Sequence, residues 1–208
     1  MAVCGLLAAP ALAEHSAKDG QSHTGKTGSV PPAMSAVAAV CPGQSFSQPF
    51  AALGDSNYYT EVPGSEFTSP AEGWQLRGGA HVVAGTRPDG STGSVLDLPG
   101  GAVAVSPPVC VTLQYPTARV WTHSLDGKPR VSVAVGYAST NTLARATRLG
   151  SLEDDATGEG WSLSAPFEIQ PQLGGRLEET RDVRFIFTAE TGHADMQLFG
   201  LYVDPRMR

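Results

Sequence analysis

The sequence is poor in charge and in long apolar runs, and each shortage argues against a class of protein. Only 16% of its 208 residues are charged, and the formal net charge is −6. A broad nucleic-acid surface or a surface for anionic membranes is therefore not expected. No apolar stretch reaches the roughly 20 residues that a membrane-spanning helix needs, so we expect no membrane span. Amphipathic helical patterns are also scarce, which argues against an α-helical protein.

Glycine and proline are abundant instead, with 24 and 16 residues. After residue 41 they interrupt the chain at short intervals, between short runs of alternating apolar and polar residues. This pattern is typical of many short strands joined by turns. We predict an all-β fold, a two-sheet antiparallel β-sandwich with about ten short strands and little helix.

The N-terminal part is predicted to lie outside this domain. Residues 1–13 form a short apolar run that ends in the A-x-A pattern of a signal-peptide cleavage site, so we expect a secreted, extracellular protein. No Lys or Arg precedes the run, so we expect the natural start codon to lie upstream. Residues 14–40 are rich in Gly, Ser, Thr and Pro without an apolar period, which predicts a disordered linker. The sandwich domain then covers residues 41–205.

The linker contains a literal match to the phosphate-binding P-loop, GQSHTGKT at residues 20–27. A working P-loop needs a buried strand before it and a helix after it, so that backbone N–H groups converge on the phosphate. Neither pattern flanks this match, and we interpret it as coincidental.

Cysteine is rare, and its three positions favour one disulfide. Cys4 lies in the predicted signal peptide, so Cys41 and Cys110 would remain together in an oxidising compartment. Because about 70 residues lie between them, such a bond would stabilise the fold by roughly 4 kcal/mol. Two free thiols are the first alternative. A lipid-modified Cys41 is the second, and the bulky Val40 before it disfavours it. Cys110 lies in residues 94–113, which we interpret as two strands and a turn.

The sharpest candidate site is the predicted strand of residues 118–125. Arg119, Trp121 and His123 alternate along it, so they share one face. On an exposed face, Trp121 could stack on a sugar ring while Arg119 and His123 bind its hydroxyl groups. The alternative is that Trp121 only covers the sheet and the other two are solvated. Trp74 and Trp161 begin strands, and we expect both in the core.

Motifs for catalysis are lacking. His81, His123 and His193 are scattered without the spacing of a metal site, and no G-x-S-x-G sequence occurs. The following carboxylates lie in predicted loops: Glu153, Asp154, Glu178, Glu179 and Asp182. We therefore predict that the protein is not an enzyme. A hydrolase whose site is assembled by the fold is the least favoured alternative.

Several short motifs resemble a known family. They are Trp161, Phe167-Glu168-Ile169, VRFIF at 183–187, LFGLYVDP at 198–205 and GSVLDL at 93–98. With these motifs in this order, the chain resembles the galactose-binding-like jelly roll of carbohydrate-binding modules. It is also similar to a group of uncharacterised secreted bacterial proteins in the following residues: Cys41, Gly73-Trp74, Pro107, Cys110-Val111 and Tyr202-Val203-Asp204. The resemblance covers residues 41–205 and implies a jelly roll.

The resemblance also implies a function. It suggests a secreted, non-catalytic module that binds a polysaccharide or another cell-envelope glycan. The alternative is a structural or protein-interaction β-sandwich without a small ligand. Many such modules hold a structural calcium ion through a final-strand carboxylate, but Phe199 and Gly200 stand at those positions here. Since calcium needs oxygen ligands, we expect no cofactor unless Glu66 or the acidic loop 153–155 supplies them.

Overall fold

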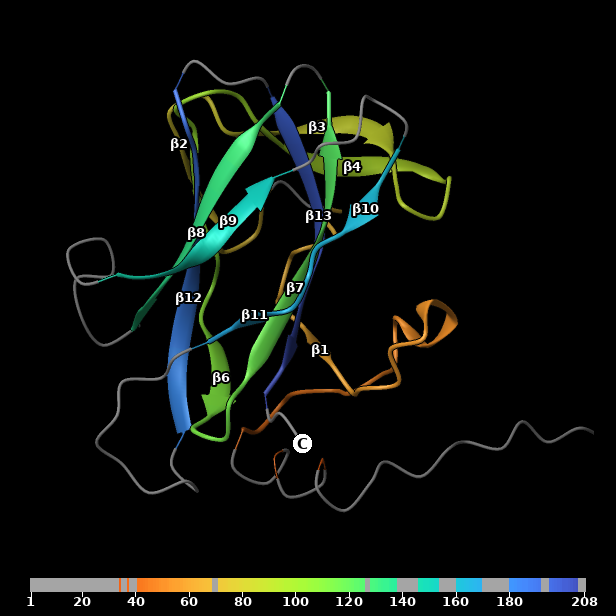
Figure 1. Ribbon diagram of the computed structural model, residues 1–208, viewed down its shortest axis with the longest axis vertical. Coiled ribbons are helices and arrows are strands. Elements are labelled where there is room, and N and C mark those ends of the chain that lie inside the picture. The colour runs from red at the N-terminus through yellow and green to blue at the C-terminus, as the bar shows by residue number, and fades with distance from the viewer. Residues whose placement is uncertain are drawn as a thin grey trace, which may run out of the picture.

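The computed structural model describes residues 34, 37, 41–68, 71–125, 128–137, 146–153, 160–169, 180–191 and 195–205. It is all-β, with two antiparallel sheets and one short 3₁₀ turn, η1 (Ala51–Leu53), as Figure 1 shows. This confirms the predicted two-sheet sandwich. The signal-peptide-like segment, the P-loop match, the Asp126-Gly127 turn and His193 lie outside the described residues.

The first sheet, here the β7 sheet, has the strand order β10-β7-β13-β4-β3, with β1 beside β13 and β11 beside β7. Its strands are β1 (Thr60–Glu61), β3 (His81–Thr86), β4 (Thr92–Leu98), β7 (Thr117–Ser124), β10 (Ser162–Leu163), β11 (Phe167–Glu168) and β13 (Met196–Asp204).

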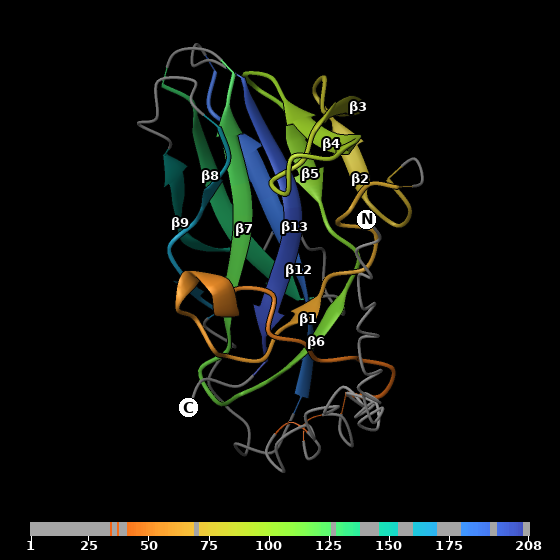
Figure 2. The same cartoon turned by 90° about the vertical axis from the view of Figure 1, so that its right-hand side faces the viewer.

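The second sheet, here the β12 sheet, has the order β2-β5-β12-β8-β9, with β6 beside β12. Its strands are β2 (Gln75–Arg77), β5 (Val103–Val105), β6 (Val109–Thr112), β8 (Arg130–Tyr137), β9 (Thr147–Glu153) and β12 (Thr180–Ala189). The two sheets pack face to face, as the side view in Figure 2 shows. The described part of the chain thus has thirteen strands, more than the ten expected.

The core lies between the sheets and follows the alternation of the sequence. On β8, Val131, Val133 and Val135 are buried and face inward because side chains alternate along a strand. On β12, Phe185 and Phe187 are fully buried, as predicted. Valine and phenylalanine dominate these strands because β-branched and aromatic side chains pack well on a pleated, buried surface.

Residues 94–113 form more than the predicted two strands and a turn. They contain most of β4 and all of β5 and β6, and the chain crosses from the β7 sheet to the β12 sheet after β4. The pair Pro107-Pro108 separates β5 from β6, since proline has no N–H to donate to a sheet. Both strands still pair with β12, one after the other.

Residues 147–153 form an edge strand of the β12 sheet. Thr147 begins β9, which pairs with β8 as far as Glu153. Glu153, expected in an acidic loop, is the last residue of this strand.

The predicted disulfide joins Cys41 to Cys110 on β6. Cys41 is fully buried and packs with Met34 and Val37. The bond therefore fastens the beginning of the described domain to the β12 sheet. It also anchors the chain that continues from Cys41 across the outside of the β7 sheet.

We expect the double variant Cys41→Ser/Cys110→Ser to lose about 4 kcal/mol of unfolding free energy, because the reduced chain gains loop entropy when it unfolds. Urea unfolding of the oxidised protein and the variant at the same pH measures the difference. An intact mass about 2 Da below that of the reduced chain would confirm the bond in the parent. Equal stabilities would contradict the anchoring role.

Candidate functional site

The outer side of the β7 sheet carries the residues predicted from the alternation of β7. Arg119, Trp121 and His123 are half-buried on this side, while Val120 and Thr122 between them are buried against the core. The structure therefore brings all three predicted residues to one face. Their role in binding remains a prediction.

A bulge in β13 adds two aromatic side chains to the same face. Phe199 pairs with Trp121, and the register then shifts so that Tyr202 pairs with Arg119. The extra residue is Gly200, whose φ of 58° lies in the left-handed region that glycine adopts freely. A Cβ at this position would lie 2.8 Å from the ring of Tyr202. The bulge and the glycine together make room for Tyr202 beside Trp121.

Trp161, which precedes β10, also lies on this face and not in the core as predicted. Its indole Nε1–H donates a hydrogen bond of 2.6 Å to the carbonyl of Thr86. Its ring lies 5.4 Å from that of His123 and 6.3 Å from that of Phe199, centre to centre. The other tryptophan, Trp74, is buried in the core as predicted. We call the set Trp121, His123, Trp161, Phe199 and Tyr202 the aromatic face.

One end of the aromatic face is closed by residues 44–59, here called the covering segment. Figure 2 shows this orange segment and η1 passing in front of β7 and β13. Phe50 is fully buried there, with its ring centre 6.3 Å from Trp121 and 5.2 Å from Tyr202. Burying a phenylalanine contributes roughly 2 kcal/mol, so this packing holds the segment on the sheet.

Arg119 holds the covering segment against the β7 sheet. Its Nη1 donates to Asp55 Oδ2 at 2.7 Å, its Nε donates to the carbonyl of Ser164 at 2.9 Å, and its guanidinium lies over the ring of Phe50. These structural contacts occupy the group. Arg119 is therefore less available to a ligand than the sequence suggested.

Asp55 is the charged partner that makes this contact strong. Burial by itself would raise the pKa of Asp55, but hydrogen bonds from Tyr59, from the Asn57 N–H and from Arg119 together hold it below its ordinary value. Burial and the neighbouring Asp55 carboxylate raise the pKa of Tyr59. The phenol therefore remains protonated and donates to Asp55 at 2.7 Å.

Polar groups surround the open part of the face. Burial, together with the carboxylates of Glu61 and Glu66, raises the pKa of Tyr202 to about 12, so its hydroxyl keeps its proton at neutral pH. His123 Nδ1 is buried without a hydrogen-bond partner among the described residues. Arg87, on the turn after β3, places its guanidinium 5.1 Å from the centre of the Phe199 ring. The site thus combines stacking surfaces with hydrogen-bonding groups.

Sequence reasoning missed Phe199, Tyr202, Trp161 and Arg87. Strict alternation would put residues 199 and 201 on one side of β13, and only the glycine at 200 hinted at a bulge. Trp161 stands before a two-residue strand, where no period exists to assign a side. Arg87 lies in the turn that joins β3 to β4, where no strand period assigns a side to its side chain.

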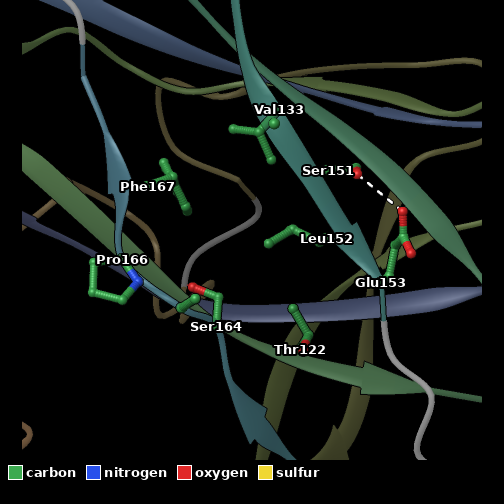
Figure 3. A pocket seen from close by; sticks show the side chains of 10 residues that line it. Thr122, Val133, Ser151, Leu152, Glu153, Ser164, Pro166 and Phe167 are labelled. Carbon is green, nitrogen blue, oxygen red and sulfur yellow. Dashed lines mark hydrogen bonds between the residues drawn. The ribbon is translucent and has the colours of Figure 1, made fainter.

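A cleft lies elsewhere, where the edges of the two sheets meet. This cleft of about 400 Å³ is lined by side chains of β7, β8 and β9 and by residues 164–167, as Figure 3 shows. Its polar groups already have local partners. Ser164 Oγ accepts from the Val120 N–H, and Thr122 donates to the Ser162 carbonyl. At the rim, Glu153 pairs with Arg130.

The polar side chains of the cleft therefore do not converge on a common point. The aromatic face is the better candidate site, because its half-buried rings lie beside polar atoms that lack partners among the described residues. Within the described residues, no three His, Cys, Asp or Glu side chains are grouped so as to hold a metal ion. The same part of the chain contains no helix long and apolar enough to cross a membrane.

Solved structures with a similar fold include carbohydrate-binding modules. One is the C-terminal CBM6 of a laminarinase from Zobellia galactanivorans, at 13% identity over 70% of this chain and 98% of that chain, with a TM-score of 0.45. Another is the CBM22-1 xylan-binding domain from Paenibacillus barcinonensis, at 11% identity over 69% and 93%, with a TM-score of 0.48.

The similar structures are not all modules of this kind. The adhesin domain of Lys-gingipain from Porphyromonas gingivalis matches at 11% identity over 71% of this chain and 94% of that chain, with a TM-score of 0.47. No protein-family model matches the sequence, and no curated protein does.

We expect Asp55→Asn to lower the unfolding free energy by about 1 to 2 kcal/mol at pH 7, because the variant loses a charge-assisted hydrogen bond. The folded pKa of Asp55 is below its unfolded value. The stabilisation is therefore present above about pH 4 and is lost as the pH falls through the folded pKa.

Urea unfolding at pH 7 and at pH 3 tests this expectation. The difference between the parent and Asp55→Asn should shrink at the lower pH. Asp182→Asn, which changes an exposed carboxylate on β12, is the matched control and should change stability little at pH 7. A difference that is the same at both pH values would contradict the role given to the Asp55 carboxylate.

Proposed function

We propose that this protein is a non-catalytic carbohydrate-binding protein and that a glycan binds on the aromatic face. The observation that carries the proposal is the partial exposure of Trp121, Trp161, Phe199 and Tyr202 on one side of one sheet. A single half-buried ring is ordinary, but several such rings gathered on one side of a sheet form the kind of apolar patch that marks a binding site. The C–H faces of sugar rings are apolar, and flat aromatic side chains provide a matching surface.

The surroundings of these rings support a polar ligand over a purely apolar one. The Tyr202 hydroxyl and His123 offer hydrogen-bonding groups next to Trp121 and Phe199. Small-ligand sites typically combine apolar walls with a few such polar groups. A sugar ring presents this combination, with hydroxyl groups at its edge and C–H groups on its faces.

The proposal includes an extracellular location. A disulfide between Cys41 and Cys110 supports an oxidising compartment, because cytosolic thiols are normally kept reduced. Polysaccharides and cell-envelope glycans are present in such compartments. The signal-peptide-like residues 1–13 point in the same direction.

Truncation of the central ring tests the proposal. We expect Trp121→Ala to weaken glycan binding about tenfold or more, since loss of stacking surface worth about 1.4 kcal/mol has that effect. A glycan array first identifies the ligand, and titration calorimetry then compares the parent with the variant. Tyr115→Ala removes an exposed ring that is not part of the aromatic face, and it should bind like the parent.

Two results would contradict the proposal, one of them the location of the site and the other the function itself. Unchanged binding by Trp121→Ala would exclude the aromatic face as the site. No binding to any glycan would exclude the function and favour a protein-interaction domain. Phe199→Ala serves as a second variant, so that a folding defect in one of them does not decide the outcome. Circular dichroism checks that each variant is folded.

A further inference from the structure

Arg87 lies flat on the sheet beside the aromatic face. Its backbone belongs to the turn between β3 and β4, where the Arg87 N–H donates to the carbonyl of Ser91. The side chain folds back so that its guanidinium stacks 5.1 Å from the Phe199 ring centre. Gly93 permits this position, because a Cβ there would overlap Nε and Cζ of Arg87.

The charge of Arg87 acts on the exposed Asp89 of the same turn, but the two form no salt bridge. Among the described residues, no carboxylate lies within 4.0 Å of its guanidinium. Its Nη2 makes one long contact of 3.4 Å with the carbonyl of Glu66, and its Nε is buried without a partner. Arg119 on the same side of the sheet is different, because Asp55 and Ser164 occupy its donors.

A second unpaired nitrogen lies close to the same rings. His123 Nδ1 is buried without a partner, and Trp161 packs against both His123 and Phe199. Trp161 is also bonded to Thr86, the residue before Arg87. The unpaired groups of Arg87 and His123 therefore border one cluster of rings. Buried polar groups without partners are rare in proteins, and they indicate a missing ligand or water.

We propose that the aromatic face selects an acidic sugar residue, one that bears a carboxylate or a sulfate ester, and that Arg87 is the residue that determines this specificity. The inference rests on the proposed function, because it assumes that a sugar ring stacks on this face. A guanidinium binds such oxyanions through paired N–H donors, and stacking on Phe199 holds its plane in a defined orientation. Because Nε is enclosed, the ligand would accept from the terminal N–H groups of Arg87, where Nη2 makes only the long, exposed contact with Glu66.

The other charges on this side of the sheet give the ligand a direction. Glu61 pairs with Tyr202 across β1 and β13, so its carboxylate makes the Tyr202 end unfavourable for an acidic group. Glu66 gives no direction, because its carbonyl accepts from Arg87 while its carboxylate also acts on Tyr202. Asp97 is buried and accepts a hydrogen bond from Gln197. The acidic group of the sugar therefore points toward Arg87, with the ring over Trp121 and Phe199.

Binding of matched acidic and neutral glycans to the full chain tests the proposal. The panel contains polygalacturonate, its methyl ester, alginate, a sulfated galactan and neutral galactan. We expect at least one acidic glycan to bind about tenfold or more tightly than every neutral one. We expect Arg87→Gln to remove that preference, because a hydrogen bond to a charged group is lost, and Arg87→Lys to restore part of it.

Two more variants separate this role from a structural one. Gly93→Ala keeps the charge of Arg87 but displaces its guanidinium from Phe199, so it should also reduce the acidic preference. Arg77→Gln removes an exposed arginine of β2, in the other sheet, and should leave the preference unchanged. Binding only to the sulfated galactan would identify a sulfate ester, and binding only to uronates would identify a carboxylate.

The outcomes distinguish this inference from the proposed function. Neutral glycans that bind as tightly as acidic ones, in a manner that depends on Trp121, would overturn the role of Arg87 and leave the function intact. An acidic preference that Arg87→Gln does not change would also overturn it. Absence of binding to every glycan, acidic or neutral, would overturn both.

Discussion

The pairing of β13 with β7, interrupted at Gly200, is the constraint on which the outer surface depends. β13 pairs with β7 and with β4, and β1 pairs with its end. One extra residue shifts the alternation, so that Leu198 and Leu201 both face the core while Phe199 and Tyr202 both face outward. Without the shift, residues 199 and 201 would share a side. The bulge therefore places side chains of β13 both in the core and on the aromatic face.

The covering segment determines how much of that face stays open. The disulfide fixes its beginning at Cys41, and Phe50 is buried against Trp121 and Tyr202. Arg119 adds an ion pair that crosses 64 positions of sequence to Asp55. These contacts cover one end of the aromatic face.

Two arginines on the same side of the sheet have different roles because of their surroundings. Arg119 is occupied by a carboxylate, a carbonyl and a ring. Arg87 stacks on a ring and forms no salt bridge with a described residue. An ion pair of the first kind stabilises the fold, whereas a guanidinium without a salt bridge beside half-buried rings is suited to a ligand. The two roles follow from position, since the residue type is the same.

The sequence alone was sufficient for the features that depend on local periodicity. The alternation of β7 predicted that Arg119, Trp121 and His123 share one face, and the short alternating runs between glycines and prolines predicted the two-sheet sandwich. The disulfide was predictable because Cys41 and Cys110 were the only cysteines left after the predicted signal peptide. The shared face depends only on the order of side chains within one strand, and the disulfide depends only on the number of cysteines.

Only the tertiary structure decided which of these residues are free to contact a ligand and which are held by other parts of the chain. Asp55 reaches Arg119 from a distant part of the chain, and Trp161 is held on the outer face by the carbonyl of Thr86, 75 positions away. The bulge at Gly200 becomes definite only when β13 is paired with β7. The alternation of apolar and polar residues within one strand carries no information about contacts between segments so far apart. The sequence therefore determined the sandwich and one face of β7, and long-range packing determined the composition of the site.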